Sequence, residues 1–137
     1  MALFIGKVVL LMLVLSLTVM TISGEDIGRK TRHIKILNDL DGNFPLTVHC
    51  KSADDDIGEK TLRHGAVYEF SFQPKVIPRT TLFFCSFQWN SILHHFNVYY
   101  EGVDCSECWY TVKNDGKNLC RYDFAVGQYD LCYVWND

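Results

Sequence analysis

Apolar and polar residues alternate along most of the chain after residue 30, with the period of a β-strand that buries one face. In residues 46–51, for example, Leu46, Val48 and Cys50 fall on one face and polar side chains on the other. No window indicates an amphipathic helix longer than two turns. Similar alternation, rich in aromatic and β-branched residues, recurs over residues 33–36, 67–72, 80–89, 95–100, 108–113 and 129–135.

Turn-forming residues separate these runs. Asp41-Gly42-Asn43 predicts a hairpin turn between the first two runs, and Asn114-Asp115-Gly116 predicts another near the end. Pro74 and Pro78 bracket a connection that cannot be a central strand. Short strands at regular turn spacing are typical of an all-β fold, and we predict a small, disulfide-stapled antiparallel β-sandwich of about seven to eight strands.

Residues 1–24 have a different character. Lys7 is the only charged residue before Glu25, residues 8–20 are almost wholly apolar, and the small residues Ser23 and Gly24 follow. This order predicts a secretory signal peptide over residues 1–24 and a single mature domain over residues 25–137. The alternative is a membrane anchor, but the run is shorter than the roughly 20 residues that a spanning helix requires. We therefore expect a secreted, extracellular protein with no membrane insertion once the leader is removed.

Length and charge exclude several classes. The chain has 137 residues, of which 48% are hydrophobic and 21% charged, which excludes a disordered tail and favours one domain. The formal net charge is −3, and removal of the leader takes away one base and no acid. A protein that follows nucleic-acid phosphates needs a positive face, so no nucleic-acid partner is expected.

Six cysteines survive removal of the leader. In an oxidising compartment they are expected to form disulfides, although sequence alone cannot choose among 15 possible pairings. Cys105 and Cys108 have the spacing of a redox pair, but such a pair needs a helix start, and a strand-like run follows here. We predict structural disulfides from the six residues Cys50, Cys85, Cys105, Cys108, Cys120 and Cys132.

Two clusters contain residue types that bind metals, but neither has the arrangement of a known metal site. His94 and His95 are neighbours on a predicted strand, so they point to opposite faces; one should pack and the other face solvent. The acidic residues Asp54, Asp55 and Asp56 lack the alternating order of a calcium loop. With Gly58 they predict a structural turn, in which Asp side chains bond nearby backbone N–H groups. No catalytic residue, metal or cofactor is expected.

The landmarks taken in order are more specific than any one of them. His49-Cys50-Lys51-Ser52 precedes the acidic turn, Phe84-Cys85-Ser86-Phe87-Gln88-Trp89 follows, and Cys108-Trp109, Cys120 and Tyr129-Asp130-Leu131-Cys132 complete the series. This sequence resembles the plant self-incompatibility protein family, also called the S-protein homologues, over nearly the whole mature chain. One departure is the longer Lys117-Asn118-Leu119 segment before Cys120, where relatives often have Gly-Pro-Cys.

The resemblance implies a small secreted β-sandwich without catalytic activity. The best-understood members of the family are pistil ligands that a pollen surface receptor recognises, which leads to rejection of self pollen, while many others have no such role. We therefore expect a monomeric ligand that binds a cell-surface receptor in cell–cell recognition. Self-incompatibility between pollen and pistil is one form of such recognition. The alternatives are a secreted defence or inhibitor module that binds a microbial protein, glycan or lipid, and, less favoured, a secreted hydrolase or redox enzyme.

A ligand that must be distinguished from its relatives should carry specificity on exposed loops. Residues 39–43 and 73–79 are candidate loops of this kind. The residues that we predict to contact the receptor are Glu101, Gly102, Val103, Asp104 and Glu107 in one loop, and Arg63 and His64 in another.

Overall fold

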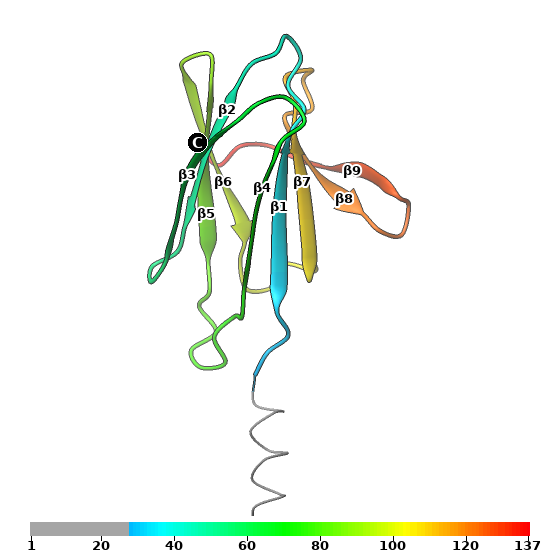
Figure 1. Cartoon of the computed structure of the whole chain (residues 1–137). Helices are drawn as coiled ribbons and strands as arrows, with labels where there is room; N and C mark the ends of the chain where they lie inside the picture. The colour runs from blue at the N-terminus through cyan, green and yellow to red at the C-terminus, as the bar shows by residue number, and fades with distance from the viewer. Residues whose placement is uncertain (1–27) are drawn as a thin grey trace, which may run out of the picture.

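The computed structural model describes residues 28–137 and shows an all-β protein with nine strands in two sheets (Figure 1). The leader predicted over residues 1–24 lies outside the described residues. In the part that is described, no helix has the length and apolar character needed to cross a membrane. The strands are β1 (Arg32–Asn38), β2 (Leu46–Lys51), β3 (Asp56–Leu62), β4 (Val67–Phe72), β5 (Phe83–Trp89), β6 (Ile92–Tyr99), β7 (Glu107–Val112), β8 (Leu119–Asp123) and β9 (Gln128–Tyr133).

The two sheets have five and four strands. The five-stranded sheet has the order β4-β1-β7-β8-β9 and the four-stranded sheet the order β3-β2-β5-β6. The predicted all-β fold is confirmed, but a wholly antiparallel arrangement is wrong at one place, because β1 pairs with β7 in parallel, His33 opposite Glu107. All other strand pairs are antiparallel.

Two further expectations need correction. The structure has nine strands because β3 and β8 were not expected: β3 buries only Leu62 fully, and β8 has just five residues directly after a turn. The turn at residues 41–43 forms but is no hairpin turn, since β1 and β2 belong to different sheets. Alternation shows which residues are buried, but it does not show which strands pair.

The core lies between the sheets and follows the alternation. Ile34 and Ile36 of β1 and Val48 of β2 are fully buried, as are residues of the other central strands. Three aromatic side chains, Phe70, Phe72 and Trp89, are half-buried and pack against this core. The following residues of β5, β6 and β7 are buried within it: Phe87, Phe96, Val98, Tyr110 and Val112.

Two buried tyrosine hydroxyls join one sheet to the other. Tyr110 on β7 donates a hydrogen bond of 2.6 Å to the carbonyl of Val98 on β6. Tyr68 on β4 donates one of 2.6 Å to the carbonyl of Gly58 on β3. Burial raises the pKa of both phenols, so they remain protonated donors. Since an unpaired buried carbonyl is costly, these bonds fix how the sheets are aligned.

Asn38 organises one end of the sandwich. Its side chain is fully buried, and its Nδ2 donates to the carbonyls of Phe44 and Leu62 at 3.0 and 2.9 Å. Its Oδ1 accepts from the backbone N–H of Leu40, and its own carbonyl accepts from Gly65. The side chain thus satisfies backbone groups of the loop after β1 and of the end of β3, and the Asn38 carbonyl satisfies one in the loop after β3.

All six cysteines form disulfides, which confirms the structural prediction. The pairs are Cys50–Cys85, Cys105–Cys108 and Cys120–Cys132. The first joins β2 to β5 in the centre of the four-stranded sheet, where both cysteines are buried. The last joins β8 to β9 at directly opposed residues, and the second links Cys105, which precedes β7, to Cys108, the second residue of β7.

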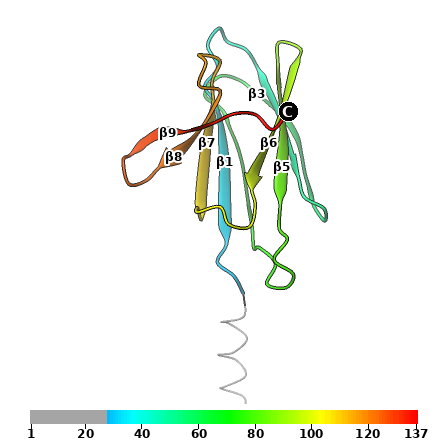
Figure 2. The ribbon, with the colours of Figure 1, turned by 180° about the vertical axis from the view of Figure 1, so that it is seen from behind.

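The segment after β9 closes one side of the sandwich. Figure 2 shows it crossing from β9 to the edge of β6. Asn136 donates its N–H to the carbonyl of His95, and the Asp137 carboxylate accepts from the backbone N–H of His95 and from His94 Nδ1 at 2.8 and 2.6 Å. His94 stacks on Trp135 with ring centroids 4.6 Å apart. His95 is about half exposed, so one histidine packs and the other faces solvent, as expected.

The disulfides should differ in their contribution to stability. The Cys50–Cys85 bond closes a loop of 35 residues and the Cys120–Cys132 bond one of 12. Loop entropy predicts that C50A/C85A lowers the free energy of unfolding by about 4 kcal/mol and C120A/C132A by about 3 kcal/mol. Guanidinium denaturation of the non-reduced proteins measures both. A larger loss for C120A/C132A would contradict the entropic account.

The contact of Asp137 with His94 should be visible in acid. The hydrogen bond from His94 lowers the pKa of Asp137 below its ordinary value of 3.8. A lowered folded-state pKa means that its stabilisation is present above that ordinary value and is lost as pH falls through the folded value. Asp137→Asn should therefore flatten the change in tryptophan fluorescence below pH about 4. Asp130→Asn, an exposed carboxylate on β9, is the control and should leave that change as in the wild type.

Candidate recognition surface

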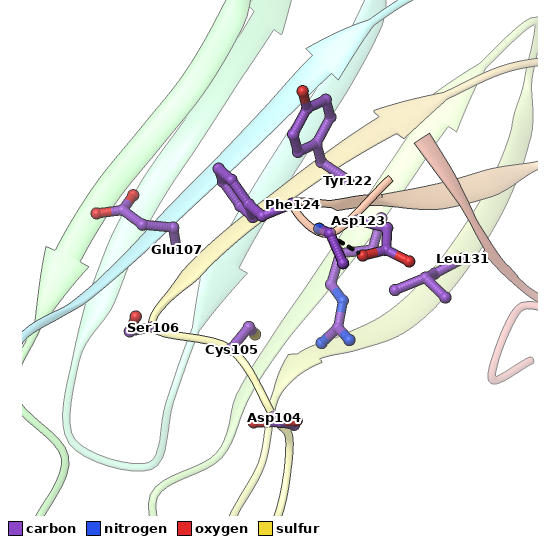
Figure 3. Close-up of a pocket in the computed structure, with 10 residues that line it drawn as sticks. Asp104, Cys105, Ser106, Glu107, Tyr122, Asp123, Phe124 and Leu131 are labelled. Atoms are coloured by element: carbon purple, nitrogen blue, oxygen red, sulfur yellow. Dashed lines mark hydrogen bonds between the residues drawn. The ribbon is translucent and has the colours of Figure 1, made fainter. Parts of the chain in front are cut away.

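A groove of about 480 Å³ lies between the loop that enters β7 and the β8–β9 hairpin. It is lined by residues 104–107, residues 121–125 and Leu131. Figure 3 shows the loop from Asp104 to Glu107 along one side, with Phe124, Asp123 and Leu131 across from it. The parallel pairing of β1 with β7 places the start of β7, and with it this loop, beside the start of β1.

The β8–β9 hairpin forms the other wall of the groove, and hydrogen bonds stabilise its turn. Asp123 accepts the backbone N–H of Ala125 with its side chain at 2.9 Å and that of Gly127 with its carbonyl at 2.7 Å. Gly127 has φ of 81°, a conformation in which side chains other than that of glycine are strained. In Figure 1 the hairpin projects from the sandwich, and Phe124 and Val126 at its end are 55% and 58% exposed. Large apolar side chains at the end of a hairpin have no role in the core.

Four aromatic side chains cover the outer face of the sheet beside the groove. We call Trp109, Tyr122, Phe124 and Tyr129 the aromatic cluster. Phe124 lies 4.9 Å from Trp109 and 4.8 Å from Tyr122, with the rings inclined at 64° and 74°. Tyr129 meets Tyr122 at 5.0 Å and 72°. Lys35 Nζ lies 4.6 Å above the ring of Trp109, so a cation already covers one face of the cluster.

Acidic side chains dominate the charge of the groove. Its lining carries Asp104, Glu107 and Asp123 against a single base, Arg121. Glu107 accepts the indole N–H of Trp109 at 3.1 Å, which couples the charge to the aromatic cluster. The Asp104 side chain is exposed and makes no hydrogen bond or ion pair with the described residues. The groove therefore offers free carboxylate oxygens next to aromatic rings.

The residues predicted to contact a receptor do not all lie together. Asp104 and Glu107 line the groove. Glu101 instead forms a bidentate ion pair with Arg29, with N···O distances of 2.7 and 3.0 Å. The hydrogen bond from Arg29 lowers the pKa of the Glu101 carboxyl. Val103 is half-buried and packs against the core, whereas Gly102 is exposed with φ of 103°. Within this loop, Asp104 has no partner among residues 28–137, whereas Glu107 accepts from Trp109 and lies 3.9 Å from His33 Nε2.

Arg63 and His64 lie at the other end of the sandwich. Their loop joins β3 to β4, and Gly65 beside them donates to the carbonyl of Asn38 at the end of β1. The loop before β7 instead meets the beginning of β1, since His33 donates to the carbonyl of Ser106. The length of β1 separates the two loops, so one small contact cannot include both.

The acidic turn is structural in part. Asp54 and Asp55 lie in a turn in which their backbone N–H groups meet Ser52 Oγ. Asp56 and Gly58 were expected in that turn but belong to β3, where a bulge accommodates Gly58 with φ of 101°. Asp56 still bonds the N–H of Gly58, as predicted for the acidic side chains, and contacts His49 at 2.6 Å. Among residues 28–137 no group of three or more His, Cys, Asp and Glu side chains is placed to hold a metal.

The hairpin residues of the groove were not among the predicted contact residues. Arg121, Tyr122 and Phe124 belong to β8 or follow it directly, and that strand was not expected. The available signal was an apolar Phe124 just before Ala125-Val126-Gly127, where a turn should be polar. The Cys105–Cys108 disulfide also borders the groove, but it leads into strand β7 and not into a helix start, which leaves the redox reading without its structural context.

Comparison with models of known protein families identifies the family of this chain. The family model of plant self-incompatibility protein S1 matches residues 33–135. The chain belongs to this S1 family. The match spans every strand from the second residue of β1 to beyond the end of β9, so it includes both walls of the groove. The family indicated by the cysteine and aromatic landmarks is confirmed.

Several curated relatives within the S1 family come from Arabidopsis thaliana. S-protein homolog 2 is 38% identical over 113 residues, which cover 77% of this chain and 68% of the relative. S-protein homolog 4 is 36% identical over 110 residues, covering 75% and 71%. S-protein homolog 5 is 39% identical over 102 residues, covering 72% and 74%. No solved structure gives a significant match.

Proposed function

We propose that the mature chain is a secreted ligand that binds a receptor protein on the surface of a plant cell, with no chemical step. Three features support this: the leader pattern of residues 1–24, membership of the plant self-incompatibility protein S1 family, and a cysteine set fully used in disulfides. A rejection response between pollen and pistil is one setting for such a ligand, and other cell–cell recognition is equally compatible with it.

The aromatic cluster is the observation that carries the proposal. Interfaces between proteins depend on a few aromatic and arginine side chains near their centre, surrounded by polar groups. Here Phe124 is more than half exposed yet fixed between Trp109 and Tyr122, so its position is already set before a partner arrives. Pre-ordered side chains lose little entropy on binding. The groove and the aromatic cluster together form the proposed contact surface.

The ring geometry disfavours a glycan as the partner. Sugars stack on broad aromatic faces, but the rings of the cluster are turned edge to face against one another, and Lys35 covers Trp109. A microbial glycan is nevertheless the alternative partner that an experiment has to exclude. The following test includes it directly.

Fluorescently labelled mature protein, residues 25–137 with its disulfides formed, should bind plant protoplasts saturably. Binding should disappear when surface proteins are digested with protease, and it should not occur on lipid vesicles or on isolated cell-wall polysaccharide. Phe124→Ala should weaken binding at least about tenfold, because truncating an aromatic hot-spot residue costs about 2 kcal/mol or more and tenfold corresponds to about 1.4 kcal/mol. Retained binding after digestion, or binding to polysaccharide, would overturn the proposal.

Leu93→Ala is the matched control. Leu93 on β6 is 50% exposed, which is close to the value for Phe124, but it lies away from the groove. Its truncation should leave binding unchanged. Circular dichroism of both variants verifies that the sandwich is folded. An equal loss of binding in the two variants would show that general surface hydrophobicity, and not the aromatic cluster, attracts the protein to cells.

A further inference from the structure

The charges that line the groove indicate the chemical class of the partner. Its lining has three carboxylates and one guanidinium, so it has two more acids than bases. Asp123 uses one carboxylate oxygen to hold the N–H of Ala125, which leaves the other free. Asp104 has neither oxygen engaged by the described residues. A ligand that enters the groove therefore meets the carboxylates of Asp104 and Asp123, which form no ion pair with the described residues, and that of Glu107, which lies 3.9 Å from His33 Nε2.

The aromatic cluster beside the groove already accommodates a cation. Lys35 Nζ lies 4.6 Å from the centroid of Trp109 and 4.0 Å from the Glu69 carboxylate. A ring face beside a carboxylate attracts an ammonium or guanidinium group by two additive electrostatic effects. Phe124 and Tyr122 line the groove together with Glu107 and Asp123, so aromatic rings and carboxylates occur in the same site. The groove thus combines the two kinds of group that hold Lys35, and its lining contains no lysine.

Size also suits a peptide segment. A volume of about 480 Å³ lies in the range of concave sites that accept a small molecule or a few side chains. The groove is open along the hairpin, whose exposed Phe124 and Val126 offer apolar contact to residues that flank a basic one. Asp104 and Glu107 supply two carboxylates from one loop of the lining, so a basic residue is attracted there even though Arg121 in the same lining opposes a second cation.

Resting on the proposed function, we propose that the receptor segment bound here is basic: a stretch with lysine or arginine that places its cation among Asp104, Glu107 and the rings of the aromatic cluster. Long-range attraction between this acidic groove and the basic segment would also accelerate association. A glycan or a neutral peptide could donate hydrogen bonds to these carboxylates but would gain no charge–charge attraction from them.

A pair of isosteric double variants tests the charge. Asp104→Asn with Glu107→Gln removes two negative charges from the groove, and Asp55→Asn with Glu59→Gln removes two at exposed positions outside it. In the protoplast assay the groove variant should bind at least about tenfold more weakly at low salt, while the second variant should match the wild type. Wild-type affinity should fall several-fold between about 50 and about 150 mM NaCl, and that of the groove variant should hardly change.

A cell-free experiment examines the same contact without the receptor. The ¹⁵N-labelled mature protein is titrated with a peptide of alternating lysine and leucine, with its glutamate counterpart and with cellohexaose, and amide shifts are followed by NMR. Shifts confined to residues 104–107 and 121–125, seen with the lysine peptide alone and lost in the groove variant, support the inference. Shifts spread over the whole surface, shifts that persist in the groove variant, or shifts produced by cellohexaose would overturn it.

The outcomes separate this inference from the proposed function. If the protein binds no protoplasts, the receptor-ligand proposal fails. If it binds, and Phe124→Ala weakens the binding while salt and the groove variant do not, the receptor contact stands and the basic segment is refuted. Binding that weakens equally in both double variants would point to net charge alone and would also refute a basic segment seated in the groove.

Discussion

The parallel pairing of β1 with β7 is the constraint on which the rest of this structure depends. Parallel neighbours cannot be joined by a tight turn, so the chain between them must make a long excursion, which here builds the whole second sheet and β4. The pairing sets Lys35 opposite Trp109 and His33 opposite Glu107. The pairing therefore brings Lys35 over the ring of Trp109. It also places the loop before β7, which forms one wall of the groove, beside the start of β1.

Neutralised and free charges occupy neighbouring positions in the same loop. Glu101 is held by both nitrogens of Arg29, which ties the segment before β1 to the loop before β7, while Asp104 three residues later has no partner among residues 28–137. The ion pair ties the loop down, whereas the Asp104 carboxylate is left to solvent. On the opposite wall, Asp123 caps the hairpin turn with one oxygen and also lines the groove. Acidic residues that are close in sequence thus have different surroundings.

Local pattern predicted much of this molecule. Alternation located the buried face of β2 and β4, and the order of cysteines and aromatics indicated the family. Pairing was beyond its reach, because nothing in residues 41–43 says whether the next strand joins the same sheet, and β3 has too few buried residues to show a period. Asn38 was also missed: a single buried amide that binds the loop after β1 and the end of β3 has no sequence pattern. Asp104 and Glu107 were named from the sequence as receptor contacts, whereas the hairpin residues across the groove were not, since β8 is short and Phe124 lies in a turn.

The bond between Cys120 and Cys132 gives the hairpin a covalent base. The residues beyond it, from Tyr122 through the turn to Tyr129, contribute little to the sheet core, and the disulfide keeps the two strands in register whatever the turn contains. Substitutions between Tyr122 and Tyr129 can therefore change the exposed surface at this end of the sandwich while the covalent link at the base of the hairpin stays in place.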